Sequence, residues 1–283
     1  MRVGFLGPDG TFSHEALLAF GDGADESVAL STVHDVVVAV QDGRVDRALA
    51  PIENSREGAV SATLDALAFD APDVVVTGEA IMPIHHLLLA GSALELGEVE
   101  IVVSHPQPLA QCQATLRRLL PQATAMAAAS TADAVREVVA SGGPRAAIGT
   151  ASAAKAYGAH VLAEGIEDEP GNATRFVWLE RASDQDAGAG ADSGLPGRTS
   201  LLFHGTGDGS AGWLVDCLAE FASRGVNLTK IESRPLRSAL GHYIFHVDLD
   251  GGPGDPAVAE AVDALRAHCE EVRVLGSYAV PIG

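Results

Sequence analysis

Residues 169–179 read Glu-Pro-Gly-Asn-Ala-Thr-Arg-Phe-Val-Trp-Leu. The stretch begins polar, with a proline and a glycine, and then becomes an apolar run of strand-forming residues. We therefore predict a loop that enters a strand, with Thr174 and Arg175 at the junction. Such a junction suits a ligand site, because the strand holds the side chains while the loop leaves room beside them. An ordinary strand start with one exposed arginine explains the same stretch, so the rest of the chain has to decide.

Toward the N-terminus, short apolar segments alternate with helical segments, many of which end at glycines. The pattern predicts strands at 3–6, 28–30, 47–50, 74–77, 84–90, 101–103, 123–127, 146–149 and 161–166. It predicts helices that end near 20 and 120, and others at 33–41, 59–68, 131–140 and 151–157. Short connections between such elements indicate an α/β fold with largely parallel sheets. Extended crossings near 78–84 and 166–173 predict two lobes with a cleft between them, the second lobe inserted into the first.

Polar residues collect where predicted strands end and helices begin. In sheets of this kind ligands bind beyond the carboxyl ends of the strands, and helix N-termini attract anions. These loops therefore predict a site for a small polyanion. Helix capping is the alternative role for the same side chains. The candidate ligand-binding residues are Thr11, Ser13, Asn54, Ser55, Ser104, His105, Gln107 and Thr150.

The chain of 283 residues has a formal net charge of −20 and only two lysines. Such a surface repels nucleic acid and anionic membranes, so we expect neither as a partner. No apolar run reaches the length of a membrane span and the first residues do not resemble a signal peptide, which predicts a cytoplasmic protein. The three cysteines lie far apart and are predicted to be free thiols. Adjacent His85 and His86 point to opposite faces of a strand, which argues against a metal site.

A second domain is predicted after residue 197. Residues 183–197 are small, polar and rich in glycine, which is typical of a linker. Beyond them the pattern predicts strands at 199–204, 226–237, 241–250 and 271–278 and helices at 210–224 and 255–268. This βαββαβ order is that of a ferredoxin-like domain. We expect one face of its sheet to carry the helices and the other to be free to pair with a second copy of the chain.

Five motifs now suffice to identify a family. They are Gly-Pro-Asp-Gly-Thr-Phe-Ser at 7–13, Pro-Ile-Glu-Asn-Ser at 51–55, Ser-His-Pro-Gln at 104–107 with Leu-Ala-Gln-Cys at 109–112, Thr-Arg-Phe at 174–176, and Asn-Leu-Thr-Lys-Ile-Glu-Ser-Arg-Pro at 227–235. In this order they resemble the motifs of prephenate dehydratases with a C-terminal ACT domain. Each motif alone is weak, but together they are a strong signal, and the resemblance covers essentially the whole chain.

The resemblance implies a two-lobed catalytic domain over residues 1–182, like a type 2 periplasmic binding protein, and an ACT domain over 198–283. Lobe 1 would comprise about 1–77 and 168–182, and lobe 2 about 78–167. The resemblance also implies a lyase without cofactor or metal that converts prephenate to phenylpyruvate in L-phenylalanine biosynthesis. Feedback control by L-phenylalanine at the ACT domain, a homodimer formed through ACT domains and a homotetramer are further implications.

On this resemblance Thr174 and Arg175 are the catalytic candidates. A hydroxyl at Thr174 can donate to the departing hydroxyl group, and Arg175 can hold a carboxylate with two hydrogen bonds. Phe176 is a further candidate for the substrate site, although alternation along a strand turns it away from Arg175. The effector-site candidates are Gly212, Trp213, Leu214, Asn227, Glu232, Ser233 and Arg234.

Trp213 departs from the family's Gly-Ala-Leu segment. Its large ring is expected to fill the effector pocket, to stack on the effector or to point into the core. Two other functions remain compatible with the sequence. One is an arogenate dehydratase, whose substrate differs only in its amino acid side chain. The other is a non-catalytic amino-acid-sensing protein that keeps the binding fold.

Overall fold

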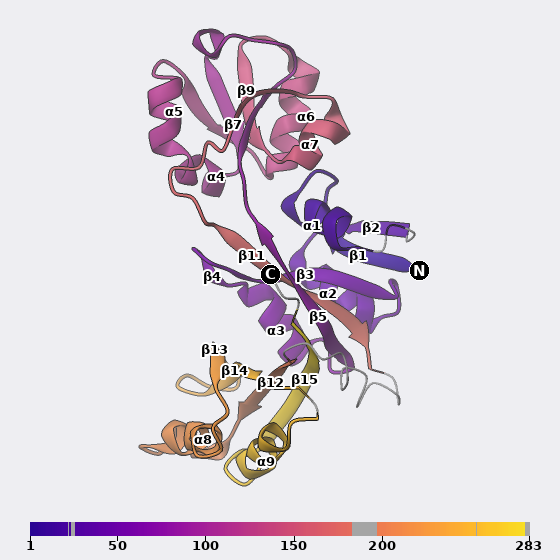
Figure 1. Ribbon diagram of the computed structural model, residues 1–283, viewed down its shortest axis with the longest axis vertical. Helices are drawn as coiled ribbons and strands as arrows, with labels where there is room; N and C mark the ends of the chain where they lie inside the picture. Colours follow the sequence, from indigo (N-terminus) through magenta and orange to yellow (C-terminus); the bar gives the residue numbers. More distant parts are fainter. Residues whose placement is uncertain (22, 24–25, 183–196, 253, 281–283) are drawn as a thin grey trace. The chain divides into compact units, whose positions relative to one another are not determined.

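The computed structural model describes residues 1–21, 23, 26–182, 197–252 and 254–280 (Figure 1). The chain forms two compact units, which we describe separately. Unit 1 comprises Met1–Val36, Asn54–Gly58 and Met82–Thr174, and unit 2 comprises Val37–Glu53, Ala59–Ile81 and Arg175–Gly283. The division into two lobes, a linker and an ACT domain stays a prediction. The predicted linker lies outside the described residues, apart from Gly197.

The first sheet has the strand order β2-β1-β3-β11-β5, with β4 paired to β3. β1 and β2 run parallel. The crossing predicted near 78–84 is the second half of one continuous strand, β5. The elements are β1 (Arg2–Leu6), α1 (Phe12–Phe20), β2 (Glu26–Leu30), α2 (Val33–Gln41), β3 (Arg47–Asn54), β4 (Gly58–Ala59), α3 (Ser61–Phe69), β5 (Val74–Pro83) and β11 (Ala173–Arg181).

The second sheet lies within unit 1 and has the order β10-β6-β9-β7-β8. The prediction of largely parallel sheets is wrong here, because β6 runs antiparallel to both β9 and β10, whereas β7 is parallel to β8 and β9. The elements are β6 (Leu87–Ala90), η1 (Leu96–Glu98), β7 (Ile101–Ser104), α4 (Pro106–Gln111), α5 (Gln113–Leu119), β8 (Thr124–Ala127), α6 (Thr131–Ser141), β9 (Arg145–Gly149), α7 (Ala151–Tyr157) and β10 (His160–Glu164).

Helices cover both faces of this second sheet (Figure 1). Consecutive strand residues point to opposite faces. Leu88 and Val102 accordingly pack with Leu116 of α5, whereas Leu89 and Val103 pack with Val138 of α6. Burial on both faces explains why these strands read as continuous apolar runs rather than as alternating ones.

One predicted helix is divided. The helix expected to end near residue 120 is broken between α4 and α5 at Cys112, whose φ of −112° and ψ of 7° leave helical geometry. The Cys112 N–H is shared between the carbonyls of Pro108 and Ala110, and its side chain is fully buried. No helix in the described part of the chain is long and apolar enough to cross a membrane.

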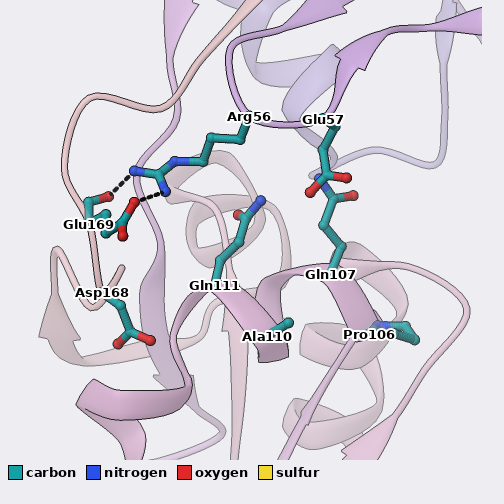
Figure 2. A pocket seen from close by; sticks show the side chains of 8 residues that line it. All are labelled: Arg56, Glu57, Pro106, Gln107, Ala110, Gln111, Asp168 and Glu169. Carbon is teal, nitrogen blue, oxygen red and sulfur yellow. Dashed lines mark hydrogen bonds and ion pairs between the residues drawn. The ribbon is translucent and has the colours of Figure 1, made fainter.

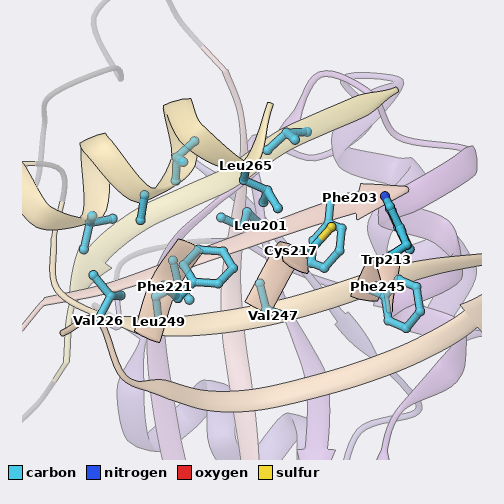
Figure 3. Packing of buried hydrophobic residues seen from close by; sticks show 14 residues of the cluster. Leu201, Phe203, Trp213, Cys217, Phe221, Val226, Phe245, Val247, Leu249 and Leu265 are labelled. Carbon is cyan, nitrogen blue, oxygen red and sulfur yellow. The ribbon is translucent and has the colours of Figure 1, made fainter. Parts of the chain in front are cut away.

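The C-terminal part of unit 2 confirms the predicted ferredoxin-like order. Its antiparallel sheet has the order β13-β14-β12-β15. The elements are β12 (Gly197–His204), η3 (Thr206–Gly209), α8 (Trp213–Ala222), β13 (Leu228–Pro235), β14 (Tyr243–Asp250), α9 (Pro256–Leu265) and β15 (Glu271–Ala279). Trp213, Phe203 and Phe245 pack together between the sheet and its helices, with ring centroids 5.4 to 6.1 Å apart (Figure 3).

The opposite face of this sheet is not free, so that prediction is wrong. Ser200, Asp248 and Tyr278 on this face are all buried. Arg175 of β11 bonds Asp248, and Ser200 donates to the other Asp248 oxygen at 2.6 Å. The sequence did not predict this burial, because His246 and Asp248 of β14 are polar and a polar face of a sheet was expected to be exposed. They are instead polar groups buried against other polar groups.

Candidate active site

The side chains of Thr174 and Asn54 form the centre of the candidate site. Asn54 Nδ2 lies 2.9 Å from Thr174 Oγ1 and 3.0 Å from Asn172 Oδ1. Asn54 Oδ1 accepts hydrogen bonds from the backbone N–H groups of Arg56 and Glu57. These contacts fix the orientation of the amide, because its oxygen faces two donors and its nitrogen faces two oxygens. Thr174 Oγ1 is therefore an acceptor from Asn54.

This arrangement leaves the hydroxyl proton of Thr174 available. Among the described residues we find no hydrogen bond in which Thr174 is the donor, and the side chain is only half-buried. A hydroxyl that already accepts one hydrogen bond becomes a better donor, because chains of hydrogen bonds polarise one another. The geometry thus suits donation to a ligand oxygen.

Backbone and side-chain bonds tie the Asn54 segment to the Thr174 segment. Ser55 N donates to Ala173 O at 2.9 Å, and Ala173 N donates to Ser55 Oγ at 3.0 Å. The Ser55 hydroxyl lies 3.3 Å from Asn172 Oδ1, and Asn172 is buried. The capping alternative is wrong for Asn54 and Ser55, since the following helix, α3, begins only at Ser61.

A pocket of about 580 Å³ lies beside these segments in unit 1 (Figure 2). Its size is that of a small-molecule site. Thr174 is not among its lining residues, but the lining includes the residues that directly follow Ser55 and those that closely precede Asn172. The pocket is lined by Arg56, Glu57, Pro106, Gln107, Ala110, Gln111, Asp168 and Glu169. Of the predicted residues, Gln107 lines it.

Two of the pocket's charged residues already have partners. Arg56 Nη1 lies 2.6 Å from Glu169 Oε2, and its Nη2 donates to the Glu169 carbonyl (Figure 2). The same Nη2 also donates to the carbonyl of Pro170. Asp168 accepts from the N–H groups of Ala114 and Thr115 at the start of α5. Burial alone would raise the pKa of Asp168, but these two donors hold it below its ordinary value.

Gln111 is held at the pocket by a buried histidine. His86 Nε2 lies 2.9 Å from Gln111 Oε1, and Phe12 packs edge-on against the His86 ring. Burial lowers the pKa of His86, which favours the neutral ring. The predicted opposite orientation of the neighbouring histidines is confirmed, because His85 is exposed and bonds Glu167.

The N-terminal glycine turn packs on the start of α7. Thr150 Oγ1 donates to Gly10 O at 2.8 Å, and Tyr157 donates to Asp9 O. Gly10 has a φ of +85°, and a Cβ there would lie 3.0 Å from the Cα of Ala153. Glycine is therefore the residue that this close approach allows.

Several predicted ligand contacts have structural partners. Thr11, His105 and Thr150 cap α1, α4 and α7, as the capping alternative predicted. The hydroxyl protons of Thr11 and Ser104 go to the carbonyls of Leu6 and Ile148. Contacts of these side chains with a substrate stay predictions that the present bonds do not support. The buried residues in this group also include Ser13 and Phe176.

Arg175 is not among the residues that line the pocket. Its side chain is 9% exposed, and its guanidinium lies 2.9 Å from Glu53, 3.2 Å from Glu79 and 2.6 Å from Asp248. Arg198 bonds the same Glu79 carboxylate. A substrate-clamping role for Arg175 stays a prediction, and its contacts describe a buried ion-pair network instead.

The effector candidates lie on α8 and β13 of unit 2. Gly212 precedes α8 with a φ of +93° and is exposed, whereas Trp213 points into the core, where its Nε1 donates to His268 O at 2.8 Å. Arg234 bonds Asp65 of α3 through two nitrogens. The remaining candidates are Leu214, half-buried against the core; Asn227, bonded to Asp250; Glu232, half-buried; and Ser233, exposed.

Comparison with known proteins shows the family of the chain. The family model described as prephenate dehydratase matches residues 3–184. The chain belongs to the prephenate dehydratase family. A prephenate dehydratase from Amycolatopsis methanolica is 39% identical over 279 residues, which cover 98% of this chain and 88% of that protein.

Solved structures agree with the family. The prephenate dehydratase of Arthrobacter aurescens, solved in complex with L-Phe, matches with a TM-score of 0.89 and 36% identity over 99% of this chain and 90% of that one. A structure described as GqqA, a quorum-quenching acylase, matches with a TM-score of 0.86 and 27% identity over 99% of this chain and 98% of that one. The predicted family and the predicted α/β and ferredoxin-like folds are confirmed.

Three residues at the candidate site were not among our predicted site residues. Asn172 and Gln111 lie inside or beside quoted motifs, but their roles depend on Asn54 and His86, which are distant in sequence. Arg56 follows the Pro-Ile-Glu-Asn-Ser motif directly. Its charge could have identified Arg56 as a site residue, since a cation beside two candidate ligand residues is unusual in a chain of net charge −20.

Proposed function

We propose that this protein converts prephenate to phenylpyruvate with loss of carbon dioxide and water. The observation that carries the proposal is the Asn54–Thr174 hydrogen bond in the family's Thr-Arg-Phe segment. It leaves a hydroxyl proton for the leaving group. Family membership supplies the substrate class, and the pocket beside the segment supplies the room.

The reaction needs modest help from the protein. The bond between the ring and its carboxylate breaks, the electron pair enters the ring, and the bond to the 4-hydroxyl breaks as the ring becomes aromatic. The departing oxygen gains negative charge in the transition state. Thr174 donates its hydrogen bond to that oxygen, while Asn54 stabilises the charge that Thr174 then shares. A donor placed where charge develops typically contributes about 10²- to 10³-fold to the rate.

We also propose that L-phenylalanine regulates the enzyme through the C-terminal domain. The Arthrobacter relative was solved with L-Phe. In this chain, Gly212 opens the N-terminus of α8, where free N–H groups suit an amino acid carboxylate. Glu232 of β13 belongs to the Glu-Ser-Arg-Pro segment that the family resemblance assigns to the effector site. A homodimer through these domains, a homotetramer and a cytoplasmic location belong to the same proposal.

The direct test is turnover. Purified protein is mixed with prephenate, and the ultraviolet absorbance of phenylpyruvate is followed. Turnover of arogenate, whose product is L-phenylalanine, is measured in parallel by amino acid analysis. We expect phenylpyruvate to form, with a higher kcat/KM for prephenate than for arogenate. The sensor alternative predicts ligand binding without turnover. Addition of L-phenylalanine to the same assay tests the regulation, and an unchanged rate would remove that part of the proposal.

A further inference from the structure

Prephenate is a dianion, so its site must supply a positive group in a chain of net charge −20. The sequence predicted Arg175 as this positive group. However, each of its terminal and bridging nitrogens donates to a carboxylate of the chain itself: Glu53, Glu79 or Asp248. Asp248 is a buried partner, and exchanging it for substrate would leave its carboxylate without the guanidinium.

Among the described residues that line the pocket, Arg56 is the one cation. Its ion pair with Glu169 is of a kind that can exchange, because the Glu169 side chain is 76% exposed. Exposed ion pairs contribute little to stability, and solvent can replace one partner at low cost. The two backbone carbonyls that Arg56 also contacts hold the guanidinium in place without neutralising its charge.

A second group in the pocket is missing an acceptor. Gln111 Nε2 is buried and has no hydrogen-bond partner in the described structure, while its Oε1 is fixed by His86. A buried donor without a partner is costly, which points to a ligand oxygen at this position. In Figure 2 the side chains of Gln107 and Gln111 both reach from α4 toward the segment that carries Arg56 and Glu57.

We propose that Arg56 binds a substrate carboxylate, and that Glu169 occupies the same guanidinium in the free enzyme. This inference rests on the proposed function. The carboxylate is that of the pyruvyl side chain, because the ring carboxylate is lost and a cation bound to it would oppose decarboxylation. The pyruvyl carboxylate keeps its charge throughout, so Arg56 binds ground state and transition state alike and acts on KM rather than kcat.

Three variants and one matched control test this by steady-state kinetics with prephenate. Arg56→Met should raise KM about 10-fold or more with kcat within a factor of about 3, the scale of a lost charge-assisted hydrogen bond. The KM of Arg56→Lys should lie between those of the unchanged enzyme and Arg56→Met, since lysine keeps the charge but lacks the planar guanidinium. Glu169→Gln should lower KM about 2- to 5-fold, because the competitor for the guanidinium loses its charge. The control is Arg136→Met, which removes an exposed arginine from an equally short ion pair with Asp133.

The sign of the Glu169 effect separates the proposal from a structural role. If Arg56 only holds the Glu169 segment in place, Glu169→Gln loosens that segment. KM then rises in both Arg56→Met and Glu169→Gln, and this result would overturn the proposal. Equal KM values for Arg56→Met and Arg136→Met would also overturn the proposal. Circular dichroism of each variant checks the fold, and Glu169→Gln remains informative if Arg56→Met fails to fold.

Inhibition by phenylpyruvate identifies the carboxylate, because this product keeps only the pyruvyl one. We expect its inhibition constant to rise in Arg56→Met by about the same factor as the KM. A raised KM with unchanged phenylpyruvate inhibition would refute the assignment to the pyruvyl group. Absence of prephenate turnover in the unmodified enzyme is a different result and would refute the proposed function instead.

Discussion

The guanidinium of Arg175 in β11 lies 2.6 Å from the carboxylate of Asp248 in β14, and both side chains are buried. The contact joins the strand that carries the Thr-Arg-Phe motif to the C-terminal sheet. Burial by itself would lower the pKa of Arg175, but the nearby charge of Asp248 and Glu79 raises it above its ordinary value. The guanidinium of Arg175 therefore stays charged.

Loss of Arg175 should destabilise the protein strongly. Arg175→Met removes the guanidinium that bonds Asp248 and Glu53, and breaking a buried pair costs about 3 to 5 kcal/mol. Chemical denaturation measures the free energy of unfolding. The control on the same strand is Arg181→Met, whose exposed 3.5 Å ion pair with Asp73 should contribute less than about 1 kcal/mol.

A double-variant cycle checks that the effect belongs to the pair. Asp248→Asn combined with Arg175→Met should cost clearly less than the sum of the two single changes, because the second change removes a charge that the first left uncompensated. Strict additivity would show that Arg175 acts through its other partners.

Local signals predicted the elements well. The predicted bounds of α2 and α7 match the structure, and α7 has both a Thr150 cap and a Gly158 stop with a φ of +67°. Such signals lie within a few residues of one another. The partners of Arg175 do not: Glu53, Glu79 and Asp248 come from three other strands. Nothing in a single strand's pattern reveals that a polar residue is buried against a distant opposite charge.

The sequence motifs predicted which residues meet at the candidate site. They did not predict which hydrogen bonds those residues form, because the partners are set by the folded chain. Asn54, Ser55 and Thr174 meet as expected of loops at strand ends. Thr11 and Thr150 have the same residue type and the same kind of position, yet their hydroxyl protons go to backbone carbonyls. Which hydroxyl keeps a free proton depends on the amide orientation of Asn54, and that is a property of the folded chain.

Thr174→Ala should lower kcat by about 100-fold or more, because the departing oxygen loses its hydrogen-bond donor. Thr174→Ser keeps the hydroxyl and should retain most of the activity. Thr124→Ala removes an exposed threonine hydroxyl from β8 and is the matched control. Near-normal turnover by Thr174→Ala, measured with phenylpyruvate absorbance, would contradict the role assigned to Thr174.

Asn54→Asp should be more damaging than Asn54→Ala. With alanine, Thr174 loses a donor but keeps its proton, and we expect kcat to fall about 10-fold. A carboxylate at this position would accept the Thr174 proton and withdraw it from the substrate, so kcat should fall by about 100-fold or more. Equal rates for the two variants would mean that the proton is not the functional feature.

Trp213→Ala should destabilise the C-terminal domain by about 3 to 5 kcal/mol, because it leaves a cavity between Phe203 and Phe245. Val215→Ala on the exposed side of the same helix is the control and should cost less than about 0.5 kcal/mol. Since the indole points inward, Trp213→Phe should keep the L-phenylalanine response of the unchanged enzyme. A lost response in a variant of normal stability would place Trp213 at the effector.

Acid should destabilise the protein through His246 of β14. The side chain is buried, and neither ring nitrogen has a hydrogen-bond partner in the described structure. Burial, with Lys230 and Arg273 nearby, lowers the pKa of His246 to about 4, although Asp248 and Asp65 act in the opposite direction. The unfolded chain has a histidine pKa of about 6.5, so between these values it binds more protons than the folded chain.

The free energy of unfolding should therefore fall as the pH is lowered from about 6.5 to 4 and should be insensitive to this histidine above that window. The difference of the two pKa values corresponds to about 3 kcal/mol. Urea denaturation at pH 7, 5.5 and 4.5 follows this fall, because these conditions begin above the window and end near its lower limit. His246→Gln should flatten the profile, whereas His160→Gln, at an exposed histidine of β10, should leave it unchanged. If the His246→Gln profile stays parallel to that of the unchanged protein, the acid sensitivity arises from another group.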